Sequence, residues 1–157
     1  MTQEEKELLI KDLSARVHYG LKCKVRYWDG SGRLYVTGDM PFIGIIGNTC
    51  VFKTNFIHEN TLSVDIAEVK PYLRPMSSMT EEEQKEFGSL VGLWKNPSTS
   101  RFINCLPNLS GEFGKTLITE VIITKAIDWL NANHFDYRGL IEKGLALEAK
   151  EGMYETE

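Results

Sequence analysis

The chain has 157 residues and a formal net charge of −4, with 42% hydrophobic and 25% charged residues. These values are ordinary for a folded protein, and they argue against wholesale disorder and against a strongly basic, nucleic-acid-binding composition. A chain of this length is most simply one domain, so we expect residues 1–157 to form a single domain.

The start of the chain is polar and acidic, without the apolar stretch of a secretory signal. The longest apolar run, residues 42–46, is far shorter than the roughly 20 residues that cross a bilayer. The three cysteines are widely spaced and odd in number, which does not suggest a disulfide framework. We therefore expect a cytoplasmic protein without membrane contact, its cysteines buried as free thiols.

The N-terminus carries a helix start signal. Thr2 and Glu5 stand three residues apart, as in a capping box, where each side chain bonds to the backbone N–H of the other residue. Apolar residues then recur at helical spacing, and Gly20 can end the segment. The pattern predicts a helix over residues 3–17.

Residues 21–76 have the pattern of short strands. Apolar and basic residues alternate from residue 21, a glycine-rich turn follows at 29–32, and further short apolar segments are separated by glycine and polar residues. This favours a small antiparallel sheet or an SH3-like half-barrel. Pro71 and Pro75 disfavour a central strand near the end of this part and predict an extended exit from the sheet.

Residues 80–150 are expected to be mainly helical. Thr80 and Glu83 repeat the capping-box spacing and predict a helix to about residue 90. A loop rich in Asn, Pro, Ser and Gly follows, with one short strand near residues 102–106.

Another helix is predicted over residues 116–131, which have a broad apolar face. Because this segment is rich in β-branched residues, a strand over 117–123 is the alternative. After it, Asp136 can cap a short helix over residues 137–143. Together these elements predict an α+β fold with an N-terminal helix, a small sheet and a helical C-terminal half.

No motif in the sequence indicates catalysis, a cofactor or a metal. Gly114, Lys115 and Thr116 resemble the end of a phosphate-binding loop, but Leu109 stands where that loop needs its first glycine. The cysteines and histidines share no metal-ligand spacing and no nucleophile signature. We expect no cofactor and no metal, and we favour a protein that is not an enzyme.

A basic strand offers one candidate binding site. Cations and aromatic rings are interleaved at Lys22, Lys24, Arg26, Trp28 and Arg33, and such a surface can follow phosphates while stacking on bases. The alternative is that the outward face of an antiparallel strand is charged to remain soluble and to blunt an edge. The acidic total charge weakens the nucleic-acid hypothesis.

An aromatic and cationic cluster near the C-terminus offers a second candidate site. It consists of Trp129, His134, Tyr137 and Arg138, and Trp, Tyr and Arg are the residues that dominate protein-binding hot spots. The alternative is that Trp129 and the neighbouring Phe135 fill the core of the protein itself.

Two stretches carry a resemblance. Residues 70–83 (Lys-Pro-Tyr-Leu-Arg-Pro-Met-Ser-Ser-Met-Thr-Glu-Glu-Glu) and residues 128–149, which include His-Phe-Asp-Tyr-Arg-Gly-Leu-Ile-Glu-Lys-Gly, resemble a group of small uncharacterised proteins of gut Bacteroidetes, often in prophage or mobile-element neighbourhoods. The resemblance implies a bacterial or phage cytoplasmic protein and assigns no functional residue.

We therefore expect a small non-enzymatic interaction module that binds an unidentified protein partner. The alternative is a nucleic-acid-binding accessory protein that uses the basic strand. The sequence leaves the oligomeric state open.

Overall fold

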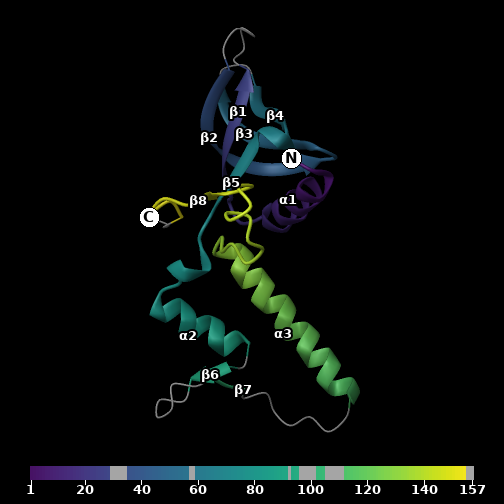
Figure 1. Cartoon of the computed structure of the whole chain (residues 1–157), viewed down its shortest axis with the longest axis vertical. Coiled ribbons are helices and arrows are strands. Elements are labelled where there is room, and N and C mark those ends of the chain that lie inside the picture. The colour runs from purple at the N-terminus through teal and green to yellow at the C-terminus, as the bar shows by residue number, and fades with distance from the viewer. Residues whose placement is uncertain (29–34, 57–58, 92, 96–101, 105–111, 155–157) are drawn as a thin grey trace. The chain divides into compact units, whose positions relative to one another are not determined.

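A computed structural model of the protein describes residues 1–28, 35–56, 59–91, 93–95, 102–104 and 112–154 (Figure 1). In the described part of the chain, three α-helices and a six-stranded sheet confirm the α+β fold class predicted from the sequence. The chain forms two compact units, Met1–Pro75 with Asn131–Glu157, and Met76–Leu130. Residues 131–154 thus belong with the sheet rather than with the helical part in which the sequence pattern placed them.

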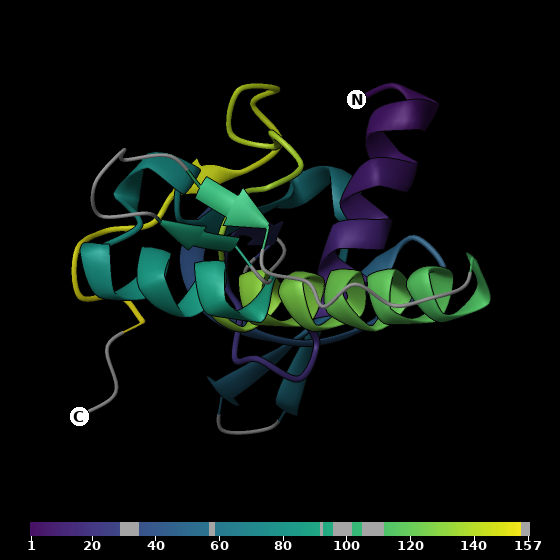
Figure 2. The same cartoon turned by 90° about the horizontal axis from the view of Figure 1, so that it is seen from below.

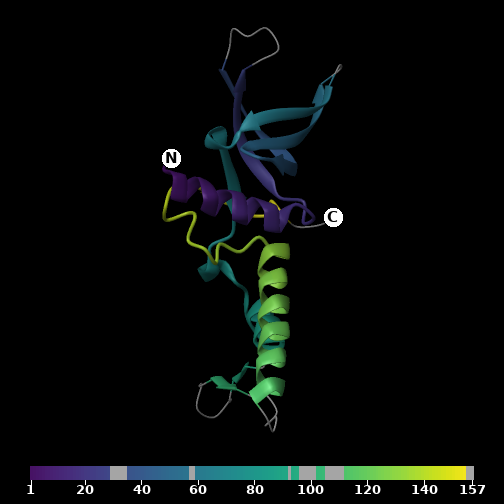
Figure 3. The same ribbon diagram turned by 90° about the vertical axis from the view of Figure 1, so that its right-hand side faces the viewer.

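The first unit begins with helix α1, Gln3–Arg16. Its capping box is formed as predicted: the backbone N–H of Glu5 donates to the Thr2 hydroxyl, and the backbone N–H of Thr2 donates to the Glu5 carboxylate. Leu9 and Leu13 face inward and are fully buried. The cap therefore places an apolar stripe of α1 against the sheet, which Figure 3 shows from the side.

The sheet has the strand order β4-β3-β2-β1-β5-β8. Its strands are β1 Lys22–Trp28, β2 Tyr35–Ile46, β3 Thr49–Phe56, β4 Glu59–Asp65, β5 Val69–Leu73 and β8 Leu147–Glu148. Neighbouring strands are antiparallel, except that β8 runs parallel to β5. The sheet is therefore mixed, whereas the sequence predicted an antiparallel sheet or half-barrel. The short 3-10 helix η1, Ile66–Glu68, connects β4 to β5.

Strand β5 lies inside the sheet although it contains Pro71, so the expectation that the prolines disfavour a central strand is wrong here. The register explains how the sheet accommodates this proline. Pro71 pairs with Cys23 of β1, but β8 pairs only with Tyr72 and Leu73. Beside Pro71, β5 thus has a paired strand on one side only, and a missing N–H is tolerated there.

The core of the first unit lies between the sheet, α1 and the C-terminal segment. Phe42 and Phe52 are register partners on β2 and β3, and their rings meet edge to face at 5.8 Å between centroids. The C-terminal segment adds Leu140 and Leu145, which are buried with them. Residues more than a hundred positions apart in sequence therefore share one core.

In its described residues, the second unit contains three helices and two strands (Figure 2). They are the 3-10 helix η2 (Met76–Ser78), helix α2 (Glu81–Leu90), strand β6 (Leu93–Lys95), strand β7 (Phe102–Asn104) and helix α3 (Glu112–Ala132). The last two residues of α3 belong to the first unit. The predicted capping box of Thr80 and Glu83 is formed at α2. Helix α3 rules out the alternative of a strand over 117–123. The aromatic rings of Phe87 and Trp129 pack at 5.4 Å between centroids.

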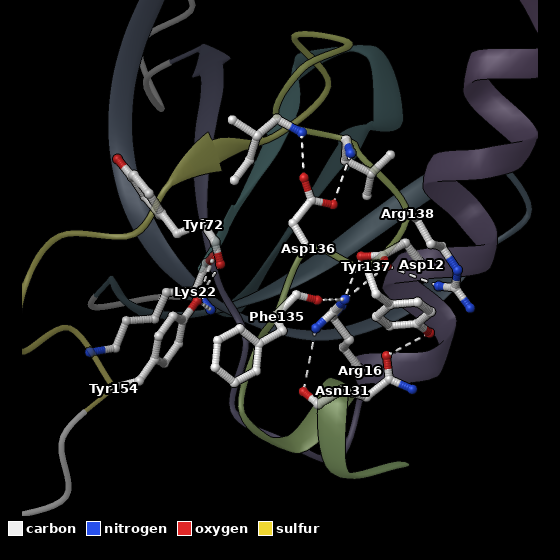
Figure 4. A network of polar contacts seen from close by, with 12 residues as sticks. Asp12, Arg16, Lys22, Tyr72, Asn131, Phe135, Asp136, Tyr137, Arg138 and Tyr154 are labelled. Carbon is white, nitrogen blue, oxygen red and sulfur yellow. Dashed lines mark hydrogen bonds and ion pairs between the residues drawn. The ribbon is translucent and has the colours of Figure 1, made fainter. Parts of the chain in front are cut away.

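The helix predicted over residues 137–143 is not formed, and turns take its place. Gly139 and Gly144 both have φ 68°, a left-handed conformation that interrupts a helix. Asp136 does act as a cap: its carboxylate accepts hydrogen bonds of 2.8 Å from the backbone N–H groups of Leu140 and Ile141 (Figure 4). The capping residue was identified correctly, but the cap closes a turn instead of starting a helix.

Within the residues that the structure describes, no helix combines the length and the apolar character needed to cross a membrane.

Candidate functional site

A fully buried ion pair lies at the end of α1. The guanidinium of Arg16 donates from Nε to Oδ2 of Asp12 at 2.8 Å and from Nη2 to Oδ1 at 3.0 Å, and both side chains are 0% exposed. The two residues are one helical turn apart, so the helix itself sets this forked geometry. A charge pair removed from water in this way is stable only if its remaining hydrogen-bonding groups are also satisfied.

The C-terminal segment satisfies these groups. Arg16 donates to the backbone carbonyls of Phe135 at 2.8 Å and Asn131 at 3.5 Å, and Arg138 donates to Oδ1 of Asp12 at 2.9 Å (Figure 4). One carboxylate thus receives two guanidinium groups, one of them from a residue 126 positions later. This network joins α1 to the segment after α3.

Tyr137 lies between the two guanidinium groups. Its hydroxyl donates to Oδ1 of Asn131 at 3.1 Å, and the guanidinium carbons of Arg138 and Arg16 lie 4.7 and 5.6 Å from its ring centroid. Burial raises the pKa of the Tyr137 phenol above its usual value, so the hydroxyl stays protonated at neutral pH. Its role is to pack against cations, which is a structural role.

His134 has an unusual environment. It has φ 59°, its side chain is almost completely buried, and its imidazole stacks on the Tyr154 ring at 3.7 Å between centroids. Its Nδ1 has no hydrogen-bond partner among the residues that the structure describes. Burial, with the nearby positive charges of Arg16 and Arg74, lowers the pKa of His134 to about 4. The imidazole is therefore neutral at pH 7.

The structure brings together three of the four residues of the predicted protein-binding cluster. His134, Tyr137 and Arg138 belong to the first unit, whereas Trp129 belongs to the second and packs on Phe87. Tyr137 and Arg138 are held by internal partners, and Arg138 has only 16% of its side chain exposed. These contacts favour a structural role for that part of the cluster.

Asp12 and Arg16 were not singled out in the sequence, although a signal for them exists. They fall on the same helical stripe as Leu9 and Leu13, at spacings of three and four residues. An acidic and a basic residue one turn apart on a buried stripe indicate a buried pair that needs partners from elsewhere in the chain. The identity of those partners depends on the tertiary fold.

Lys22, Lys24, Arg26 and Trp28 of the predicted basic strand lie on the exposed face of β1, and the residues between them point to the other face. Lys22 donates from Nζ to the Met153 carbonyl at 2.7 Å, and Arg26 forms an ion pair of 3.3 Å with Glu68. Lys24 is exposed, and Trp28 is 61% exposed. The last predicted member, at position 33, lies outside the described residues.

Helix α3 exposes apolar side chains. Val121, Ile123 and Ile127 retain 46%, 51% and 36% of their surface, within two turns of the helix. Ile123 and Ile127 are four residues apart and therefore lie on the same side of the helix. The sequence pattern predicts a broad apolar face over residues 116–131, but it does not indicate that apolar side chains of this helix stay exposed.

The described residues contain no group of three or more His, Cys, Asp or Glu side chains arranged to hold a metal ion. Cys23 and Cys50 are buried free thiols, in agreement with the sequence. Burial raises the pKa of both thiols, that of Cys50 to about 12, so neither is a reactive thiolate.

Comparison with known proteins gives no match: no protein-family model, no curated protein and no solved structure is significantly similar to the chain.

Proposed function

We propose that the protein is a non-enzymatic interaction module that binds a protein partner, and that helix α3 provides the contact. The observation that carries the proposal is the exposure of Ile123 and Ile127, which lie four residues apart on one side of the helix. Single exposed apolar residues are normal on a protein surface, but several such residues close together on one element are typical of an interaction site.

The spacing of these residues supports a partner that presents an apolar helical face. Ile123 and Ile127 form a ridge one turn long, and such ridges fit the grooves of another helix. The exposed, charged Asp128 directly follows Ile127 at the border of the ridge, where it would help to orient the partner. Binding of this kind requires no catalytic group.

Site-specific photo-crosslinking tests the proposal. A photo-reactive phenylalanine derivative in place of Ile123 should crosslink a partner in the host cell, and Ile127→Glu in the same chain should abolish the crosslink. The matched control carries the photo-reactive group in place of Lys125, which is exposed on another side of the same helix. Equal crosslinking from positions 123 and 125, or crosslinking that survives Ile127→Glu, would contradict the proposal.

A cytoplasmic location and a bacterial or phage origin also belong to the proposal. They are supported by the resemblance of residues 70–83 and 128–149.

Nucleic-acid binding by β1 is a second candidate, favoured by one feature of the register. Lys24 lies directly opposite Lys70 of β5, and like charges in that arrangement repel each other. Asp39 lies opposite Lys24 on the other side and offsets part of the repulsion. A phosphate bound between the two lysines would offset the rest.

The test of this candidate is fluorescence anisotropy with labelled duplex DNA and single-stranded RNA. Binding should weaken steeply with salt and should be lost in Lys24→Glu/Lys70→Glu, whereas Lys11→Glu on α1 should change it little. Binding that is absent, or that does not depend on salt, would eliminate the candidate.

A further inference from the structure

The side chain of Tyr154 is held by contacts that recognise a phenol. Its hydroxyl donates to the Tyr72 carbonyl at 2.8 Å and accepts from the backbone N–H of Lys22 at 3.2 Å, with the Lys22 carbonyl 3.5 Å away. Figure 4 shows Tyr154 lying against Lys22 and Tyr72. We call the place bounded by Lys22, Tyr72 and His134 the tyrosine slot. A phenylalanine there would leave the N–H of Lys22 without this acceptor.

His134, which forms one wall of the tyrosine slot, has a conformation and an environment that cost free energy. His134 adopts a left-handed backbone conformation that is uncommon for residues other than glycine, and its buried Nδ1 has no hydrogen-bond partner in the described part of the chain. In return, the imidazole offers a flat face on which the Tyr154 ring stacks at an interplanar angle of 26°. Backbone strain of this kind is concentrated at sites that bind ligands.

The surroundings of the slot carry positive charge. The Lys22 ammonium lies 5.9 Å from the Tyr154 ring centroid, and the guanidinium carbon of Arg74 lies 4.3 Å from the ring centroid of Phe135, the residue after His134. The charge of Arg16 is offset by its pair with Asp12, and Asp39, which accepts from the Tyr72 hydroxyl at 2.7 Å, offsets part of the rest. The ammonium also donates to the Met153 carbonyl, so it recognises main chain rather than a particular side chain. A tyrosine flanked by acidic residues fits this potential, and the chain has Glu151 and Glu155 on either side of its own tyrosine.

The segment that fills the slot has few other anchors. We call residues 150–154 the C-terminal strap. Its Lys150 forms a 3.8 Å ion pair with Asp39, and both side chains are well exposed, so this pair contributes little. The backbone N–H of Met153 bonds within the strap, to the Lys150 carbonyl. Among the residues that the structure describes, the strap is therefore held chiefly by Tyr154 and Lys22, and a segment with so few contacts opens at low free-energy cost.

We propose that the tyrosine slot is a binding site for a tyrosine of a partner peptide with acidic flanks, and that the C-terminal strap occupies the slot within the chain until such a peptide replaces it. The peptide would present the same groups as the strap. These are a ring that stacks on His134, a hydroxyl that both donates and accepts a hydrogen bond, a main-chain carbonyl one residue before the tyrosine, and acidic residues nearby. This site belongs to the first unit and does not depend on the role proposed for α3.

The test uses the full-length chain with Tyr154→Ala, which empties the slot. The probe is a fluorescein-labelled peptide of residues 147–157 of this chain, followed by fluorescence anisotropy. The variant should bind this peptide at least tenfold more tightly than the wild-type chain, whose own strap competes. The same peptide with phenylalanine in place of tyrosine should bind roughly 5- to 100-fold more weakly, which corresponds to the loss of two neutral hydrogen bonds.

A second variant keeps the test decisive if Tyr154→Ala does not fold. Tyr154→Phe retains the stacking ring but loses the hydroxyl, so its strap should compete less well, and it should bind the peptide more tightly than the wild-type chain does. Circular dichroism and the thermal midpoint establish that each variant is folded.

Three outcomes would overturn the proposal. The first is a folded Tyr154→Ala chain that does not bind the peptide, and the second is equal affinity for the tyrosine and phenylalanine peptides. The third is a concentration-dependent wild-type dimer, measured by light scattering, that Tyr154→Ala abolishes. In that case the occupant would be the strap of a second copy.

Discussion

Arg16 donates two hydrogen bonds to the carboxylate of Asp12 in a place where neither side chain is exposed to water. The arrangement is stable because the remaining groups of both residues are also bonded. Arg16 reaches the Phe135 carbonyl, and Asp12 accepts from Arg138. Each member of this network therefore depends on the others, and the loss of one leaves a charge buried without its partner.

The first prediction concerns Asp12. Asp12→Ala should lower the free energy of unfolding by about 3–5 kcal/mol, because it leaves the Arg16 guanidinium buried without its counterion. Urea denaturation followed by circular dichroism measures this loss. Lys11→Ala, at the exposed neighbouring position on α1, should cost less than about 0.5 kcal/mol. A similar loss in both variants would show that the network is not what stabilises this region.

The second prediction separates a structural role from a binding role for Tyr137 and Arg138. Because both side chains are bonded inside the first unit, Tyr137→Ala/Arg138→Ala should lower the thermal midpoint by several degrees. Tyr137→Phe alone removes only the bond to Asn131 and should cost about 1 kcal/mol. An unchanged midpoint in the double variant would return these residues to the list of candidate partner contacts.

The parts of the fold that the sequence predicted depend on local interactions. The capping boxes at Thr2 and Thr80 involve residues three positions apart, so the pattern alone identifies them. The alternation along β1 is equally local, and the strand is formed as expected. Both signals arise from the geometry of one element, which a single sequence can display.

The errors arise where distant residues or particular backbone angles decide the structure. Strand β8 has two residues and exists only because Tyr72 and Leu73 offer it an edge. The turns after Asp136 replace a helix because Gly139 takes a positive φ, which composition permits but does not require. The tyrosine slot joins Lys22, Tyr72 and Tyr154 across the whole chain, and no spacing in the sequence indicates that contact.

The third prediction concerns the cysteines. Burial raises the pKa of the Cys23 and Cys50 thiols, so both should resist a thiol reagent such as 5,5′-dithiobis(2-nitrobenzoic acid) in the folded protein at pH 8. The experiment uses a Cys105→Ser chain, so that only these two thiols can react. Two thiols should titrate promptly in denaturant, and rapid reaction without denaturant would show that the sheet opens readily around them.

The fourth prediction is a dependence of stability on pH. The folded protein holds the pKa of His134 at about 4, below its usual value of 6.5, because of burial and because of the charges of Arg16, Arg74 and Lys22. The unfolded chain therefore binds more protons than the folded chain between these two pH values. The contribution is fully present above pH 6.5 and is lost as the pH falls towards 4, by roughly 3 kcal/mol in all.

Urea denaturation at several pH values between 4 and 7.5 measures this slope, and His134→Asn provides the control. Asparagine tolerates the left-handed backbone angle of this position but does not titrate, so the variant retains the local conformation and loses the ionisable group. Subtracting its curve from that of the wild-type chain removes the contribution of the carboxylates that titrate in the same range. The difference should rise from pH 4 to 6.5 and then become constant. A flat difference would mean that His134 is protonated as easily in the folded chain as in the unfolded one, and that its ring is not enclosed between Tyr154 and the surrounding cations.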